Sequence, residues 1–152
     1  MTTLNIVPEC YADTRLVEIL TESKKCNHQK NIGQVANEFL TRLKDIPCIG
    51  IVDDDKKSIP KYFTEEFKVM KEAFGLKLYK HTERSQFLIY ISPALESWLL
   101  SAAEEVELLV SDYGLNDTLK SLKRTTKTMV SNKNQDFTKA IKAYQYFFTK
   151  GN

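Results

Sequence analysis

The sequence predicts an α/β fold in which a mostly parallel four-stranded sheet is flanked by helices, with extra helices toward the C-terminal end. Runs of apolar and β-branched residues alternate with stretches whose apolar residues recur at helical spacing. The run from Pro47 to Val52 is apolar without alternation, which is typical of a central parallel strand covered on both faces. A chain of 152 residues, 42% of them hydrophobic, suits one ordinary folded domain.

The first 45 residues predict one strand and two helices. Leu4 to Val7 is a short apolar run that Pro8 ends, as expected of a first strand. Asp13 is placed to cap the first helix, and Asn31 opens a second helix that ends near Asp45. The buried stripes of the two helices are Leu16, Val17, Ile19 and Leu20, and Ile32, Val35, Ala36, Phe39 and Leu43.

Beyond the central strand, the chain predicts a helix, two strands and a long closing helix. Pro60 opens a helix that continues through Phe74 and stops at Gly75. Ser92 caps the closing helix and Pro93 takes its first position, with Trp98 on the apolar face and therefore in the core. The two strands between these helices are Leu76 to Tyr79 and Phe87 to Ile91.

Charge divides the chain into two parts. Residues 1–114 carry 14 Lys and Arg against 18 Asp and Glu, a balance of −4, whereas residues 115–152 carry 8 against 2, a balance of +6. We therefore expect a domain at 1–114 and a basic helical C-terminal extension at 115–152 that packs on the same domain. One helix face of the extension would carry Lys120, Lys123, Arg124 and Lys127, either as a surface for phosphate or as a solvated face.

Several sequence motifs that would indicate a particular localisation or chemistry are absent from the sequence. No apolar run approaches the roughly 18 residues that span a bilayer, and the N-terminus has no leader, so we expect a cytoplasmic protein that makes no membrane contact. Cys10, Cys26 and Cys48 lack CxxC spacing and are expected to be reduced, passive thiols. His28 and His81 have no ligand-spaced partners and are expected at the surface, and no nucleotide-binding glycine loop or HExxH motif is present.

Three aspartates follow the predicted central strand directly. Adjacent carboxylates at a strand end repel one another, which costs stability unless a cation or a proton neutralises them. Magnesium prefers oxygen ligands and uses one or two protein carboxylates together with water and phosphate oxygens. Because strand residues alternate in direction, Asp53 and Asp55 would face one point while Asp54 faces elsewhere, and we assign Mg²⁺ or Mn²⁺ to Asp53 and Asp55. The alternative is that these residues simply form a turn.

These motifs resemble the TOPRIM domain shared by topoisomerases, bacterial primases and OLD-type nucleases. The resemblance rests on Glu9 in IVPECYAD, just after the first strand, and on the Asp-x-Asp of IGIVDDDK; the segment IYISPALESWLL is similar to small stand-alone TOPRIM-like bacterial proteins. It covers roughly residues 4–100 and implies a Rossmann-like fold. The chain departs from the family pattern in lacking the glycines that usually follow the glutamate and the Asp-x-Asp pair: Cys10 and Lys56 stand there.

The resemblance implies metal-dependent chemistry on phosphodiester bonds. Glu9 would be the general acid or base and a member of the metal site, with Asp53 and Asp55 as metal ligands. Glu96 is an additional candidate ligand, although an acid in the first turn of a helix is stabilised by the helix dipole anyway. Asp13 is a further candidate, with a plain N-cap as its alternative.

The sequence therefore predicts divalent-metal-dependent phosphoryl transfer on nucleic acid, DNA more than RNA, with hydrolysis by a nuclease-like enzyme as the expected outcome. A non-catalytic TOPRIM-like subunit that binds nucleic acid or a partner protein, such as an ATPase, is the alternative. A phosphorelay receiver is rejected because no later strand ends in Asp. A sugar-nucleotide transferase would need a longer chain with a nucleotide-cradling segment.

Overall fold

The computed structural model of the chain describes residues 4–22, 26–54, 58–105, 107, 109–113, 118–120, 122–123 and 138–143. Of these, residues 11–13, 110 and 113 are described by their backbone alone. No helix in this part of the chain is long and apolar enough to cross a membrane.

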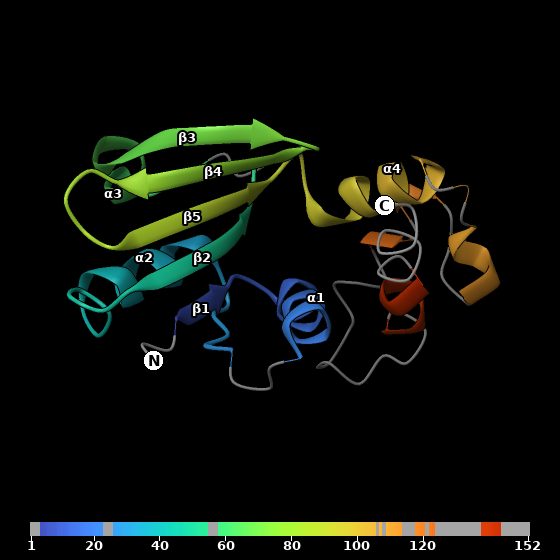
Figure 1. Cartoon of the computed structure of the whole chain (residues 1–152), viewed down its shortest axis with the longest axis horizontal. Helices are drawn as coiled ribbons and strands as arrows, with labels where there is room; N and C mark the ends of the chain where they lie inside the picture. Colours follow the sequence, from blue (N-terminus) through green and yellow to red (C-terminus); the bar gives the residue numbers. More distant parts are fainter. Residues whose placement is uncertain are drawn as a thin grey trace.

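The chain forms a five-stranded mixed sheet with strand order β1-β2-β5-β4-β3 (Figure 1). The strands are β1 (Asn5–Pro8), β2 (Cys48–Asp53), β3 (Phe67–Ala73), β4 (Leu76–His81) and β5 (Gln86–Ile91). β1, β2 and β5 run parallel to one another, whereas β4 is antiparallel to β5 and β3 is antiparallel to β4. The predicted α/β class is confirmed and β2 is the central parallel strand, but the predicted mostly parallel four-stranded sheet is wrong.

The error lies in residues 67–73, which were expected to continue the helix that follows Pro60. That helix, α3, covers only Lys61–Glu66, and the chain then enters β3. Phe74 and Gly75 both take positive φ, 54° and 73°, as the residues of a two-residue hairpin turn do, and they join β3 to β4. The hairpin pairs β3 with β4 from Phe67 to Ala73, with a register shift between Val69 and Lys71, and this pairing outweighs the helix-forming residues of KVMKEA.

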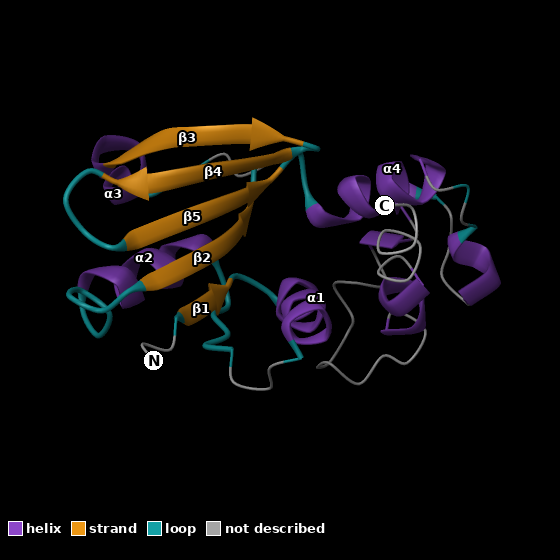
Figure 2. Cartoon of the chain, viewed as in Figure 1, coloured by secondary structure: helices purple, strands orange, loops and turns teal. Residues whose placement is uncertain are grey.

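The helices form two groups around the sheet, one on a face and one beyond an end (Figure 2). α2 (Ile32–Leu40) and α3 lie behind the sheet in this view, and α1 (Tyr11–Thr21) and α4 (Leu95–Glu105) lie beyond the end toward which β1, β2 and β5 point. A short 3₁₀ helix, η1 (Val110–Tyr113), follows α4. Each group encloses its own apolar cluster.

The first cluster joins α1, α4 and parts of the C-terminal section. Its buried residues include Leu16 and Ile19 of α1 and Leu95 and Leu99 of α4, and Trp98 packs against it. Leu122, Ala140 and Ile141 belong to the same cluster, so these three residues of the C-terminal section pack with α1 and α4.

The second cluster lies between α2, α3 and the sheet. Its members are Val7, Ile32, Val35, Ala36, Phe39, Leu43, Cys48, Val52, Phe63, Phe67, Leu88 and Tyr90. Gly50 allows close approach here, because a Cβ at this position would lie 2.8 Å from Leu88 Cδ2 and 3.1 Å from Phe39 Cζ. The buried amide of Gln86 donates to the carbonyls of Phe39 and Leu43, at 2.9 and 3.1 Å, and so fixes the end of α2 to β5.

Smaller expectations are corrected at element ends and at the histidines. α1 begins at Tyr11, so Asp13 lies inside the first turn and is not the N-cap. α4 begins at Leu95, two residues after Pro93. His81 is buried, 4% exposed, because its Nδ1 accepts hydrogen bonds from the amides of Glu83 and Arg84 in the tight β4–β5 connection. His28 is partly buried, and its Nδ1 lies 2.8 Å from Thr14 Oγ1.

The cysteines carry no disulfide. Cys10, Cys26 and Cys48 are free thiols. Burial raises the pKa of the Cys48 thiol to about 12, so this side chain stays protonated at neutral pH. Burial also raises the pKa of Cys26, with the nearby Glu18 carboxylate adding to the effect.

Candidate metal centre at the carboxyl edge of the sheet

Glu9 and Asp53 lie where the adjacent parallel strands β1 and β2 end. Pro8 pairs with Ile51, and the next amide, that of Glu9, donates to the Ile51 carbonyl at 3.0 Å. Glu9 Oε2 then accepts a hydrogen bond from the amide of Asp53 at 3.1 Å. Only 3% of Glu9 is exposed. Strand pairing thus brings together two residues 44 positions apart, at the edge where open α/β sheets bind ligands.

Asp53 also connects this edge to α4. Its Oδ1 accepts a hydrogen bond at 3.0 Å from the amide of Leu95, the first residue of the helix. The partial positive charge of a helix N-terminus stabilises a carboxylate in this position. Glu96, partly exposed, lies in the same first turn, so the structure places it in the helix that Asp53 contacts.

Asp54 has a different partner. Lys77 Nζ on β4 donates to Asp54 Oδ2 at 2.9 Å, and the Asp54 hydrogen bond and charge raise the pKa of that lysine. Lys77 pairs in register with Tyr90 of β5. Burial raises the pKa of the Tyr90 hydroxyl, with the negative charges of neighbours that include Asp54 and Glu9 adding to the effect.

These contacts offset part of the electrostatic repulsion expected between the adjacent aspartates. Asp53 is stabilised by the N-terminus of α4, and Asp54 by the ammonium of Lys77. The like-charge argument therefore no longer requires a cation at Asp54. Between Glu9 and Asp53, the structure shows a hydrogen bond from the Asp53 backbone amide to the Glu9 carboxylate.

Several predicted site residues lie outside what the structure describes. Asp55 belongs to the undescribed residues 55–57, and the side chain of Asp13 is among those not described. Lys120 is exposed and Lys123 is partly exposed, both in short helical segments, while Arg124 and Lys127 fall in the undescribed residues 124–137. Sequence reasoning missed Lys77 and Tyr90, because only the pairing of β4 with β5 brings them to this edge.

The donor chemistry at this edge fits a hard divalent cation. In the described part of the chain, no three His, Cys, Asp or Glu side chains form a ready-made metal cluster. Mg²⁺, however, needs only one or two protein carboxylates and takes water and substrate oxygens for the rest. Glu9 and Asp53 would be two such carboxylates, and both accept hydrogen bonds, as carboxylates that bind metals commonly do.

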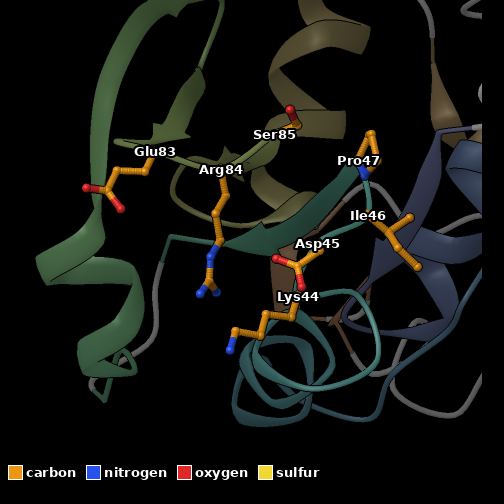
Figure 3. A pocket seen from close by; sticks show the side chains of 7 residues that line it. All are labelled: Lys44, Asp45, Ile46, Pro47, Glu83, Arg84 and Ser85. Atoms are coloured by element: carbon orange, nitrogen blue, oxygen red, sulfur yellow. The ribbon is translucent and has the colours of Figure 1, made fainter.

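A cavity of about 260 Å³ lies at the opposite edge, near the first residues of β2 and β5 (Figure 3). Figure 3 shows Lys44 and Asp45, from the segment after α2, beside Arg84 from the β4–β5 connection. Arg84 also donates to the Tyr62 hydroxyl at 3.3 Å. The cavity is not part of the carboxylate site, and its lining combines two cationic with two anionic residues. The lining residues are Lys44, Asp45, Ile46, Pro47, Glu83, Arg84 and Ser85.

The chain matches no protein-family model, no curated protein and no solved structure. The site must therefore be interpreted from its own residues.

Proposed function

We propose that this chain is a TOPRIM-like domain that carries out divalent-metal-dependent phosphoryl transfer on nucleic acid, with phosphodiester hydrolysis as the reaction. The observation that carries the proposal is the contact between Glu9 and the amide of Asp53 at the carboxyl ends of two adjacent parallel strands. Asp55, two residues further on, completes the proposed set of carboxylates. Mg²⁺ or Mn²⁺ is the metal that oxygen ligands of this kind favour.

Each residue has a distinct role in this proposal. A bound divalent cation would polarise the scissile phosphate and stabilise the charge that develops on its oxygens. Asp53, oriented by the amide of Leu95, holds the cation together with Asp55. Glu9 accepts a proton from the attacking water or returns one to the leaving oxygen. Lys77 keeps Asp54 neutralised beside this pair, so that the local negative charge stays low enough for a phosphate to approach.

The second candidate is a non-catalytic TOPRIM-like subunit that binds nucleic acid or a partner protein. The structural roles of the same carboxylates favour it: Asp53 caps α4, Asp54 pairs with Lys77, and Glu9 is almost fully buried. In this case the acids hold β1, β2, β4 and α4 together, and the site has no reaction to perform.

A cleavage assay separates the two candidates. Supercoiled plasmid and labelled single strands would be incubated with the protein and Mg²⁺ or Mn²⁺, alongside the Glu9→Gln and Asp53→Asn variants. Asp45→Asn is the matched control, because Asp45 is exposed at the opposite edge of the sheet. The proposal expects metal-dependent cleavage that both site variants lose and the control keeps. Absence of cleavage by the wild-type protein, or equal cleavage by all three variants, would favour the non-catalytic subunit.

A further inference from the structure

The first apolar cluster covers only one end of the sheet's second face, through Ile51, Leu76 and Ile91, and the rest of that face lies outside both clusters. Five apolar side chains on four strands define what we call the open-face patch: Ile6, Ile49, Phe87, Ile89 and Leu78. All five are partly exposed, and none belongs to either buried cluster or to the side chains packed against one. Figure 2 shows α2 and α3 behind the sheet and no described helix in front of β2, β5 and β4.

Strand register makes the patch continuous. Ile6 pairs with Ile49, and Ile49 pairs with Phe87, which gives one row across β1, β2 and β5. Ile89 pairs with Leu78 in the next row of the same face, because alternate residues of a strand share a face. The neighbouring positions Gly50 and Leu88 face α2 and the second cluster, which assigns the open-face patch to the opposite side. Contiguous apolar surface of this kind marks an interaction site.

A group of lysines borders the patch on the same face. Lys80 pairs with Phe87, and its Nζ lies 5.9 Å from the ring centroid. Lys68 of the edge strand β3 lies directly opposite Lys80, and Lys71 lies opposite Leu78. Like charges directly opposite one another destabilise a sheet, and both Lys68 and Lys71 are exposed. We call Lys68, Lys71 and Lys80 the lysine border.

Carboxylates that could neutralise the lysine border are lacking on this face of the strands as the structure describes them. By register, Glu72 pairs with Lys77 and so faces the other side. Asp53 lies on this face but at its far end, where it accepts the Leu95 amide. This face therefore combines the apolar open-face patch with the positive charge of the lysine border along one side. A ligand with an apolar surface and negative charge would be complementary to it.

We propose that the open-face patch and the lysine border bind an acidic amphipathic helix of a partner protein, with its apolar side on the patch and its carboxylates on the lysines. Helices recognised in grooves and on flat apolar surfaces are anchored in this way. A second copy that paired through this same face would bring lysines to the lysine border, and its residues 115–152, with a balance of +6, have the same sign as the border. Single-stranded nucleic acid stacks on aromatic rings, and four of the five patch residues are aliphatic.

The test uses the full-length chain and a fluorescently labelled 18-residue helical peptide with leucines on one side and glutamates on the other. Fluorescence anisotropy should show saturable binding at low salt that weakens as salt rises. Lys68→Glu/Lys71→Glu should weaken it by at least about tenfold, because two attractive contacts become repulsive. Lys30→Glu/Lys61→Glu is the matched control, with the same change of charge at exposed sites on other elements, and should bind as wild type. Melting curves would establish that both variants are folded.

Four results of the binding experiments would overturn the proposal. They are no binding by the wild-type protein, equal binding by the Lys68→Glu/Lys71→Glu variant, equal binding of a scrambled peptide of the same composition, and binding of a single-stranded oligonucleotide in place of the peptide. Sedimentation would be run in parallel, and a dimer that dissociates in the Lys68→Glu/Lys71→Glu variant would identify a second copy as the occupant and would likewise overturn it. None of these results depends on the carboxylate site, because Glu9 and Asp53 are unchanged in every variant.

Discussion

Replacing Asp53 tests its two proposed roles separately, as a cap for α4 and as a metal ligand. Asp53→Asn keeps a carbonyl oxygen where Oδ1 accepts the Leu95 amide, but it removes the negative charge. Asp53→Ala removes both. The difference between the two variants without metal therefore measures the cap, and the response of each to metal measures the ligand.

The expected magnitudes follow from these contacts. Losing a side-chain acceptor at a helix N-terminus costs about 1 kcal/mol, so Asp53→Ala should lower Tm by about 3 °C in a chain of this length. Losing only the charge should cost Asp53→Asn a few tenths of a kcal/mol from the helix dipole, offset by relief of repulsion with Glu9. A metal present at about 100 times its Kd should raise the stability of the wild-type protein by about 2.7 kcal/mol.

Thermal melts with and without Mn²⁺ give both quantities. The wild-type Tm should rise by roughly 5 to 10 °C with metal, whereas neither variant should respond. Asp45→Asn serves as the control and should respond as the wild-type protein does. A metal-induced shift that persists undiminished in Asp53→Asn would refute the assignment of Asp53 to the metal.

Three further predictions follow from the fold and the charges. Gly50→Ala should cost about 1–3 kcal/mol in urea unfolding because its Cβ would overlap Leu88. Gly33→Ala in α2 should cost less, because its Cβ would meet only the Asn31 side chain, at 3.2 Å, and alanine favours the helix; equal costs would contradict the packing of β2 against α2. Burial lowers the pKa of His81 below its ordinary 6.5 in the folded state, so the unfolded chain binds the proton more tightly and stability should fall as pH drops below about 6.5. His81→Asn should flatten that slope in unfolding experiments across pH, and an unchanged slope would contradict it. If nucleic acid binds the basic section, Lys123→Gln/Arg124→Gln should flatten the log–log salt dependence of duplex binding by roughly two units, measured by anisotropy; an unchanged slope excludes both residues as phosphate contacts.

The parallel half of the sheet could be predicted from the sequence, and the antiparallel half could not. A continuous apolar run such as Pro47 to Val52 has few alternatives to a buried strand, and β2 indeed lies between β1 and β5. In residues 67–73, five consecutive side chains are exposed, so no alternation of buried and exposed residues signals a strand. The helix-forming residues there favour a helix locally, and only pairing with β4 makes them a strand.

The candidate site could likewise be predicted from the sequence only in part. Glu9 and Asp53 could be placed at one edge because each follows a strand immediately and parallel strands end on the same side. Lys77 and the N-terminus of α4 could not be assigned to the carboxylates, because their contacts depend on the β4–β5 register and on where α4 begins. These contacts stabilise the adjacent Asp53 and Asp54 carboxylates.

The most direct test of the proposed metal centre is a crystal structure of the chain soaked with Mn²⁺, with anomalous diffraction measured near the manganese edge. The predicted result is a peak within about 2.0 to 2.6 Å of carboxylate oxygens of Asp53 and Asp55, with Glu9 joined to it directly or through a bound water. A map without a peak at this edge, or with manganese bound only to Asp54 or to other acids, would contradict the proposal that these carboxylates form a metal centre.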